Sequence, residues 1–159
     1  MLSLFFADQI STGLTQDLLG DEAHHASKVL RLNLGEQIKI SDGKGSWVSG
    51  PITEIEKKTL TIAISDRGAS AVVTPEIVLV QAVTKSDRNK EMLELAVGAG
   101  VDRIIPWQSE RSISKWQSDS YSKWETGIKE ACKQARQVRL PELNKVMNTN
   151  EISKLFTQN

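Results

Sequence analysis

The sequence predicts an α/β chain with an N-terminal β-barrel, and three observations support this fold class. The first half consists of short alternating segments divided by glycine-rich turns, a pattern typical of small barrels. The second half opens with the nearly continuous apolar segment "EIVLVQAV" (76–83) and then alternates between helical and extended patterns. That alternation indicates a parallel sheet. The change lies near residues 66–75, so we expect a barrel over residues 1–70 and a parallel-sheet α/β domain over residues 75–159.

Composition limits the class of protein. The 159 residues are 39% hydrophobic and 25% charged, with a formal net charge of zero, which is ordinary for a soluble globular chain. The single cysteine, Cys132, excludes an internal disulfide framework and fits a reducing compartment. No apolar run approaches the roughly 20 residues of a membrane-spanning helix. We therefore expect a cytoplasmic protein without a membrane partner.

The expected barrel is read from three strand segments and one helix. "EQIKIS" (36–41) alternates, "DGKG" (42–45) has turn chemistry, and "SWVSGPITEIE" (46–56) resumes the extended pattern. "KTLTIAIS" (58–65) places Leu60, Ile62 and Ile64 on one face. The segment "DEAHHASKVLR" (21–31) interrupts the strands as a short helix for which Asp21 is the expected N-cap.

The second half alternates strand and helix. We expect residues 76–83 to form a strand buried on both faces. "SDRNKEMLELAVGAG" (86–100) follows as a helix with Gly98 and Gly100 as stop signals and an apolar side of Met92, Leu93, Leu95, Ala96 and Val97. "DRIIPW" (102–107) is another short strand. Residues 120–136 form a helix with Tyr121, Trp124, Ile128, Ala131, Cys132 and Ala135 at helical spacing.

Basic side chains follow two consecutive strands of the expected sheet. Lys85 and Arg88 lie where a strand ends and a helix begins, and Arg111 follows the next strand. The carboxyl ends of parallel strands share one edge, which is the usual ligand-facing edge. Residues 111–139 also carry seven basic and three acidic side chains. These observations predict a cationic site for an anionic partner, against the alternative of charged loops and a solvated helix face.

Other chemistries are poorly supported. His24 and His25 are adjacent, so on a helix they point about 100° apart and are badly placed to bind one metal ion. We expect no metal site. Cys132 lies on the apolar stripe of its helix and is expected to act as a small buried hydrophobe. Trp116 and Trp124 are candidates for stacking on bases, although a core position is the expected role of Trp124.

Four motifs in order resemble the RsmE family of ribosomal RNA methyltransferases. "HASKVLR" is similar to the family's His-x-x-x-Val-Leu-Arg motif, and "DGKG" to its Asp-Gly turn. "VQAVTKSDRNKEMLELAVGAGVDRIIPWQSERS" is similar to its Lys-Gly-Asp-Arg region and the segment that ends in Glu-Arg-Ser. "EACKQARQVRLPEL" resembles the end of a family helix. The resemblance covers almost the whole chain.

The resemblance implies a fold and an activity. It implies an N-terminal PUA-like RNA-binding β-barrel over residues 1–70, followed by the first part of a SPOUT methyltransferase domain over residues 75–159. The implied reaction is S-adenosylmethionine-dependent methylation of uridine N3 in 16S rRNA of the small ribosomal subunit, by a homodimer that does not act on DNA.

The resemblance also assigns residues. Lys85 and Arg111 are the candidate catalytic residues, acting on the uracil oxygens or gripping phosphates. The expected RNA-binding residues are His25, Lys28, Arg31, Lys85, Arg88, Arg111, Arg136 and Arg139. Val29 and Leu30 are expected to anchor the short helix in the barrel. The alternative for His25 is local packing or capping.

The chain also departs from the family. It has Val97-Gly98-Ala99-Gly100 where the family has an acidic residue, Ala135 in place of a serine, and Gln137 in place of an arginine. It ends at Asn159, before the family's cofactor-binding and knot-forming loops. No cofactor-binding residue is therefore identifiable, and we expect this chain to bind S-adenosylmethionine poorly.

Two alternatives remain open on the sequence. The first is an RNA-binding module or degenerate relative without catalytic activity. The second is a protein that binds another anionic ligand.

Overall fold

The chain folds into two compact units. The computed structural model describes residues 2–157, without the side chains of residues 86 and 87. Unit 1 comprises Met1–Val72 and Arg136–Leu140, and unit 2 comprises Val73–Ala135 and Pro141–Asn159. The mixed α/β fold class predicted from the sequence is confirmed. Residues 136–140 belong to unit 1 although they follow most of unit 2 in the chain.

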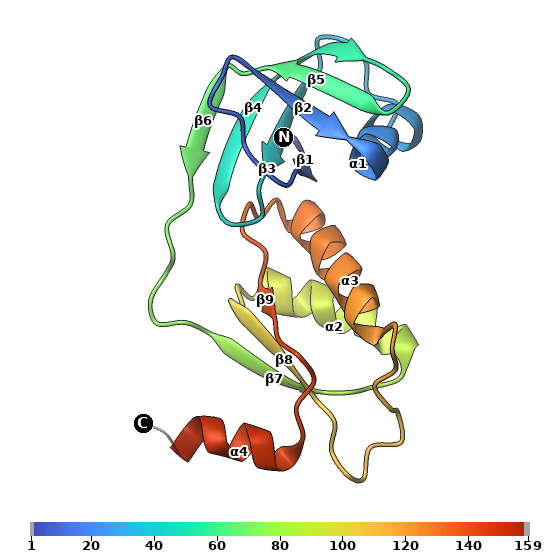
Figure 1. Ribbon diagram of the computed structural model, residues 1–159, viewed down its shortest axis with the longest axis vertical. Helices are drawn as coiled ribbons and strands as arrows, with labels where there is room; N and C mark the ends of the chain where they lie inside the picture. The colour runs from blue at the N-terminus through green and yellow to red at the C-terminus, as the bar shows by residue number, and fades with distance from the viewer. Residues whose placement is uncertain (1, 158–159) are drawn as a thin grey trace. The chain divides into compact units, whose positions relative to one another are not determined.

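Unit 1 is built around a six-stranded sheet (Figure 1). Its strands are β1 (Ser3–Phe6), β2 (Thr15–Leu19), β3 (Gln37–Ser41), β4 (Ser46–Ile55), β5 (Thr59–Ala63) and β6 (Asp66–Ala69). They run in the order β1-β3-β4-β5-β2, and β6 also pairs with β4. The β1–β3 pair is parallel and the other pairs are antiparallel. The first part of β4 pairs with β3 and β6, and the part from Ile52 onward pairs with β5, with a register shift between Ile52 and Glu54.

The core of unit 1 follows from the alternation in its strands. Ile38 and Ile40 of β3 and Leu60 and Ile62 of β5 are completely buried, because successive strand side chains point to opposite faces. The predicted turn at residues 42–45 is also confirmed. The Asp42 carboxylate accepts hydrogen bonds from the backbone amides of Lys44 and Ser46 at 2.7 and 3.0 Å.

The short helix of unit 1 packs differently from the expectation. It comprises α1 (Gly20–His24) and a π-helical turn, η1 (His25–Val29). Ala23 and Ala26 are its buried side chains, whereas Val29 is 63% and Leu30 46% exposed. The expectation that Val29 and Leu30 anchor the helix is therefore wrong, because the small alanines form the face that meets the core.

The start of the helix also differs from the expectation. The N-cap is Leu19 and makes no side-chain capping hydrogen bond, whereas Asp21 lies inside the first turn. An acidic side chain there still interacts favourably with the helix dipole.

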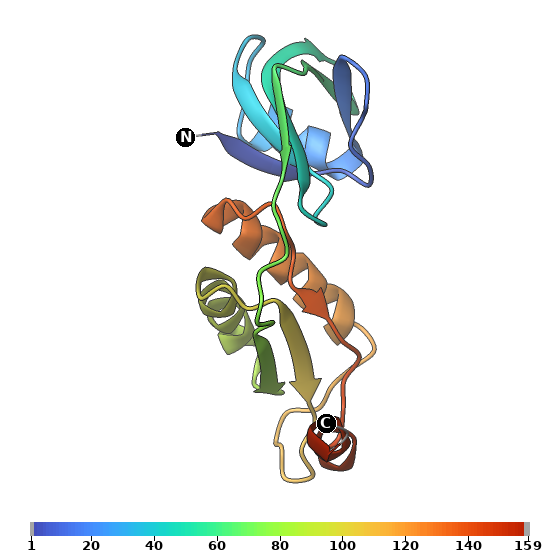
Figure 2. The same cartoon turned by 90° about the vertical axis from the view of Figure 1, so that its left-hand side faces the viewer.

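Unit 2 is a three-stranded parallel sheet with helices. The strands β7 (Val78–Ala82), β8 (Arg103–Trp107) and β9 (Glu142–Leu143) lie in the order β7-β8-β9. The helices are α2 (Ser86–Gly98), α3 (Ser120–Ala135) and α4 (Thr149–Thr157). Helices α2 and α3 pack together on one side of the sheet (Figures 1 and 2). The predicted strand–helix–strand–helix order and parallel pairing are confirmed.

Burial in unit 2 corrects two details of the sequence interpretation. Strand β7 is not buried on both faces, because in the part of the chain that the structure describes it lies at the edge of the sheet. Its first residue, Val78, is 43% exposed. Leu95 was placed on the apolar side of α2 but is 68% exposed, whereas Leu93 and Val97 are buried. On α3 the predicted stripe holds for Trp124, Ile128, Ala131 and Cys132, while Tyr121 and Ala135 are exposed.

Residues 136–140 complete unit 1. Arg136 ends α3 in the left-handed conformation (φ 59°), which turns the chain sharply. The Leu140 amide then donates to the Gly43 carbonyl at 2.8 Å. The buried Ser41 hydroxyl lies 2.6 Å from the Val138 carbonyl. The segment is therefore hydrogen-bonded to the β3–β4 turn.

Helix α4 was absent from the sequence interpretation. Its start is marked by a reciprocal capping box, in which the Asn148 amide donates to the Glu151 carboxylate and the Glu151 amide donates to the Asn148 side-chain oxygen, at 2.8 and 3.0 Å. The spacing from Asn148 to Glu151 was the available sequence signal. No helix within residues 2–157 is both long and apolar enough to cross a bilayer.

Candidate functional site

The carboxyl edge of the unit 2 sheet carries the candidate site. Strands β7 and β8 are parallel neighbours, with Val78 opposite Arg103 and Ala82 opposite Trp107, so both end at the same edge. Lys85 follows β7 as the N-cap of α2. Arg111 lies in the loop that follows β8. The topology therefore places both candidate catalytic residues after strand ends at the edge where ligands usually bind.

A pocket of about 530 Å³ lies in this region. Three segments line it: residues 83–85 with Asn89, residues 113–117 of the loop after β8, and Asp119, Ser120, Lys123 and Trp124 at the start of α3. Among these residues Lys85 appears, whereas Arg88 and Arg111 do not. The two arginines are exposed. The structure thus brings one of the three predicted cations into the pocket.

Gln108 holds the loop after β8 in place. Its side-chain oxygen accepts a hydrogen bond from the Trp116 amide at 2.7 Å. Its side-chain nitrogen donates to the Ser114 carbonyl at 3.2 Å. One amide side chain thereby fixes both ends of residues 114–116, which form part of the pocket lining. A hydrogen bond between the Ser109 and Ser112 hydroxyls, at 2.8 Å, orders the preceding turn.

Two tryptophans form the aromatic wall of the pocket. The ring of Trp116 meets that of Trp124 edge-on, with the centroids 5.2 Å apart and the planes at 67°. Trp124 is 2% exposed, so it belongs to the core as expected, whereas Trp116 is half-buried. Such edge-to-face contacts are favourable and directional. Trp116 is therefore supported from behind by a fixed core residue.

The charges around the pocket are mainly positive. Lys85, Lys115 and Lys123 are exposed lysines in its lining, and Asp119 is the one carboxylate among the lining side chains that the structure describes. Lys123 lies 2.7 Å from Asp119. The hydrogen bond from the Lys123 ammonium group holds the pKa of Asp119 below its ordinary value. At neutral pH these four side chains contribute a net charge of about +2.

Lys115, Lys123 and Asn89 were not singled out from the sequence. The two lysines fall within the basic stretch 111–139, which was the available signal. Asn89 carries no charge or motif. Its position is set by the Thr84 hydroxyl, which donates to its side-chain oxygen at 2.8 Å.

The pocket does not fit S-adenosylmethionine. The sulfonium and amino groups of that cofactor outweigh its carboxylate, so it carries a net positive charge near neutral pH. Among the described lining side chains, three lysine ammonium groups against one carboxylate disfavour such a ligand. No residue of the chain is therefore assigned to the cofactor.

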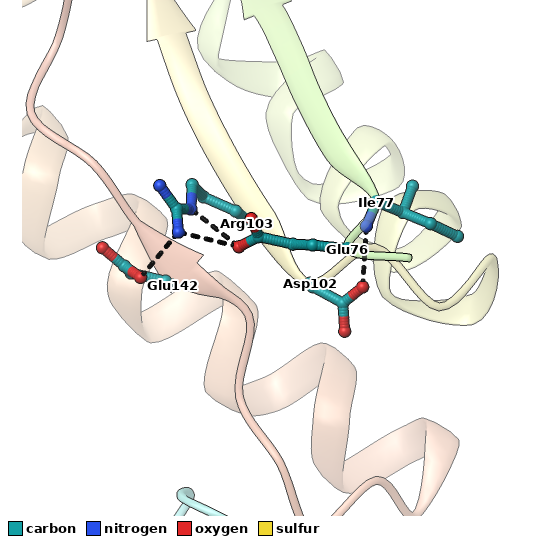
Figure 3. Close-up of polar contacts among 5 residues, drawn as sticks. All are labelled: Glu76, Ile77, Asp102, Arg103 and Glu142. Carbon is teal, nitrogen blue, oxygen red and sulfur yellow. Dashed lines mark hydrogen bonds and ion pairs between the residues drawn. The ribbon is translucent and has the colours of Figure 1, made fainter. Parts of the chain in front are cut away.

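The amino edge of the same sheet is occupied by a structural ion-pair network (Figure 3). The Arg103 guanidinium lies 2.8 Å from the Glu76 carboxylate and 3.7 Å from that of Glu142. The Asp102 carboxylate accepts a hydrogen bond from the Ile77 amide at 2.8 Å. These contacts connect the beginnings of the three strands of the described sheet.

Three predicted RNA-binding residues of unit 1 lie on its short helix or directly after it. His25 is partly buried, and its ring meets Phe5 edge-on with the centroids 6.2 Å apart. This contact gives His25 a local packing role, which was the alternative considered from the sequence. Lys28 and Arg31 are exposed, and Arg31 is in the left-handed conformation (φ 54°). Both cations are available to a polyanion.

Arg136 and Arg139 differ in their surroundings. Arg136 is exposed. Arg139 is partly buried, and its guanidinium donates to the Ser70 carbonyl at 2.7 Å. Arg139 therefore has a structural contact within unit 1.

Cys132 is completely buried, as predicted. Desolvation raises the pKa of its thiol to about 12, so it is protonated at neutral pH. Among the side chains that the structure describes, no three His, Cys, Asp or Glu are grouped to hold a metal ion.

Two family models match the chain. The model of an RNA methyltransferase domain matches residues 73–159. The model of an RNA methyltransferase PUA domain matches residues 18–65.

Curated and solved relatives agree with these matches. The ribosomal RNA small subunit methyltransferase E of Mycobacterium bovis is 31% identical over 92% of this chain and 58% of its own length. The Bacillus subtilis protein of that name is 24% identical over 93% of this chain and 59% of its own length. The crystal structure of the Neisseria gonorrhoeae methyltransferase E, bound to S-adenosyl methionine, is similar with a TM-score of 0.83 and 27% identity, over 96% of this chain and 65% of that one. The chain thus spans less than two thirds of the length of these relatives.

Proposed function

This chain belongs to the RsmE family of RNA methyltransferases, and on that premise we propose that it acts in the methylation of uridine N3 in 16S rRNA. The proposed methyl donor is S-adenosylmethionine, to which the Neisseria gonorrhoeae relative is bound. The match of the RNA methyltransferase domain model to residues 73–159 is the observation that carries the proposal. The carboxyl edge of the unit 2 sheet supplies the proposed reaction site.

The proposed chemistry requires a negative charge to be stabilised. The N3–H proton of uracil must leave before or during methyl transfer, and charge then develops on the two ring carbonyl oxygens. A lysine or arginine beside those oxygens lowers the energy of that anion. Lys85 and Arg111, which follow neighbouring strand ends, are the proposed residues for this role, and phosphate binding is the alternative for each.

Unit 1 is proposed to bind the RNA backbone. Lys28 on the short helix and Arg31, which follows the end of that helix, are exposed cations, and we assign the helical His25 a supporting role. Arg136 and Arg139 of unit 1 and Arg88 of unit 2 are further proposed RNA-binding residues. Phosphate contacts of this kind position an RNA without reading its sequence.

The proposed partner is the small ribosomal subunit, and the proposed location is the cytoplasm. Homodimer formation is proposed from the family resemblance alone.

A second candidate is an RNA-binding module without methyl transfer. It is favoured by the pocket, whose three lysines disfavour a cationic cofactor. The two candidates share RNA binding and differ in catalysis.

RNA binding tests both candidates. Charge reversal of Arg31 and Arg111 together should weaken binding of the purified chain to a small-subunit rRNA fragment. Loss of two phosphate contacts should also flatten the plot of log affinity against log salt by roughly 1.5 in slope. Charge reversal of Lys145 and Lys154 is the matched control, because both are exposed and lie outside the proposed surface. Equal affinity of the double variant and the unaltered chain would refute the proposed surface.

Methyl transfer separates the candidates. Small ribosomal subunits are incubated with the chain and isotopically labelled S-adenosylmethionine, and N3-methyluridine is measured in the recovered 16S rRNA. Labelled product supports the enzyme. RNA binding without product supports the binding module.

A further inference from the structure

We propose that the pocket beside Trp116 binds a single unpaired nucleotide, with its base against the Trp116 ring and its phosphate among the lysines. The inference rests on the proposed function in taking RNA as the ligand. It goes further by naming the part of the RNA that enters the pocket and the residue that receives the base.

The first argument is the aromatic wall. Trp116 is half-buried and its backbone amide is hydrogen-bonded to Gln108 at 2.7 Å. Its ring rests edge-on against the buried Trp124 ring. The indole is therefore held in place before a ligand arrives, and a base can stack on it without ordering a flexible side chain. Stacking on an aromatic side chain is a recurrent way of binding single-stranded nucleic acid.

The second argument is the charge of the lining. Lys85, Lys115 and Lys123 surround the same space as Trp116, and Asp119 is the one opposing carboxylate among the lining residues whose side chains are described. Two helices also begin there, α2 directly after Lys85 and α3 at Ser120. Helix N-termini carry partial positive charge. An aromatic wall beside a cationic one matches a ligand that joins a flat ring to an anion, as a nucleotide does.

The third argument is the size and shape of the site. The volume of about 530 Å³ lies in the range of roughly 300–1,000 Å³ common for small-ligand pockets. A base in a duplex is stacked on both faces and cannot reach a tryptophan in such a pocket. The nucleotide must therefore be unpaired or flipped out of its helix.

The test uses the whole chain and uridine 5′-monophosphate as the probe. The chain has four tryptophans, at positions 47, 107, 116 and 124, and each gives one indole N–H resonance by NMR. We expect the nucleotide to shift the Trp116 resonance strongly. Uridine should bind more weakly, because it lacks the phosphate, and inorganic phosphate should leave the Trp116 resonance nearly unmoved.

Substitutions separate the two walls. Trp116→Leu should weaken nucleotide binding by roughly 5- to 150-fold, the range expected for loss of one stacked base, and Trp116→Phe should retain most of it. Lys115→Gln combined with Lys123→Gln should weaken the nucleotide several-fold and leave uridine binding unchanged. Trp107→Leu is the control, because the Trp107 indole donates to the Thr149 hydroxyl and Trp107 is not among the residues that line the pocket. The remaining indole resonances report whether each variant is folded.

Four results would overturn the inference. They are an unmoved Trp116 resonance at saturating nucleotide, equal nucleotide affinity in a folded Trp116→Leu chain, inorganic phosphate binding as tightly as the nucleotide, and displacement of the nucleotide by S-adenosylmethionine. Each is independent of the rRNA measurements. If the chain binds rRNA but fails these tests, the nucleotide pocket is refuted and the proposed function stands. If the chain binds the nucleotide but no rRNA, the proposed function is refuted.

Discussion

Replacing Ser41 by alanine should destabilise unit 1 by about 2–4 kcal/mol. The Ser41 side chain is completely buried, and its oxygen lies 2.6 Å from the Val138 carbonyl, 2.9 Å from the Ser46 carbonyl and 3.1 Å from the Gly43 amide that donates to it. A hydroxyl has one proton, so it donates to one carbonyl at a time while it accepts from Gly43. A hydrogen bond contributes roughly 1 kcal/mol net, and a buried polar group left without a partner costs about 1–3 kcal/mol. The alanine variant loses one donated and one accepted hydrogen bond, and it leaves the buried partners of Ser41 unpaired. Together these losses give the range of about 2–4 kcal/mol.

The measurement is urea unfolding of a chain labelled with fluorotryptophan and followed by ¹⁹F NMR. Trp47 is the single tryptophan in unit 1, so its resonance reports that unit. With an m-value of about 1–1.5 kcal/mol/M, the Trp47 midpoint should fall by roughly 2 M. Ser46→Ala is the matched control, because Ser46 contributes backbone hydrogen bonds that the substitution keeps. If the two variants unfold within about 0.5 kcal/mol of each other, the spread typical of substitutions without a structural role, the reasoning about Ser41 fails.

Two further predictions concern unit 2. Trp124→Ala should lower the free energy of unfolding of unit 2 by about 3–5 kcal/mol, because it removes a buried indole from the core and the edge contact that supports Trp116. The ¹⁹F resonances of Trp107 and Trp116 during urea unfolding measure this loss. A loss below about 1 kcal/mol would contradict the described packing. The raised pKa of Cys132 makes stability depend on pH. The folded chain holds the thiol proton up to about pH 12, whereas the unfolded chain releases it near the ordinary pKa of 9.0. The free energy of unfolding is therefore unaffected by this thiol below pH 9 and falls as the pH rises from 9 toward 12. Urea midpoints between pH 8 and pH 11 test this, with Cys132→Ala as the comparison, and an equal decline in both chains would show that other groups are responsible.

Local patterns predicted the elements of this protein well where one face of a strand or helix meets a core. The alternation in β3 and β5 and the stripe of Trp124, Ile128 and Cys132 in α3 depend on neighbours two, three or four residues apart, which a sequence displays directly. The exposure of Val29 and Leu30 shows the limit of this reasoning. Two large apolar residues in a short helix indicated an anchor, but the close approach of the helix to the core selects the small side chains of Ala23 and Ala26.

The candidate site was predicted in part. The strand-end rule located Lys85 and Arg111 at one edge of the sheet, because parallel pairing follows from the order of elements. Which residues line the pocket depends on the path of residues 108–119. That path is fixed by the side-chain hydrogen bonds of Gln108. A glutamine in a polar loop gives no sign of that role, so Lys115, Asn89 and Lys123 entered the site only with the structure.

Residues 136–140 have a consequence for the synthesis of the protein. A chain leaves the ribosome from its N-terminus, and domains generally fold as units during that process. The six strands of unit 1 emerge first. The hydrogen bonds of the Ser41 hydroxyl with Val138 and of the Gly43 carbonyl with Leu140 can form only after those later residues have been made. By then β7, α2, β8 and α3 of unit 2 have all been made. Unit 1, whose strands precede unit 2 in the chain, thus forms its last contacts after most of unit 2 has been made. A nascent chain arrested before Leu140 exposes an incomplete β3–β4 turn.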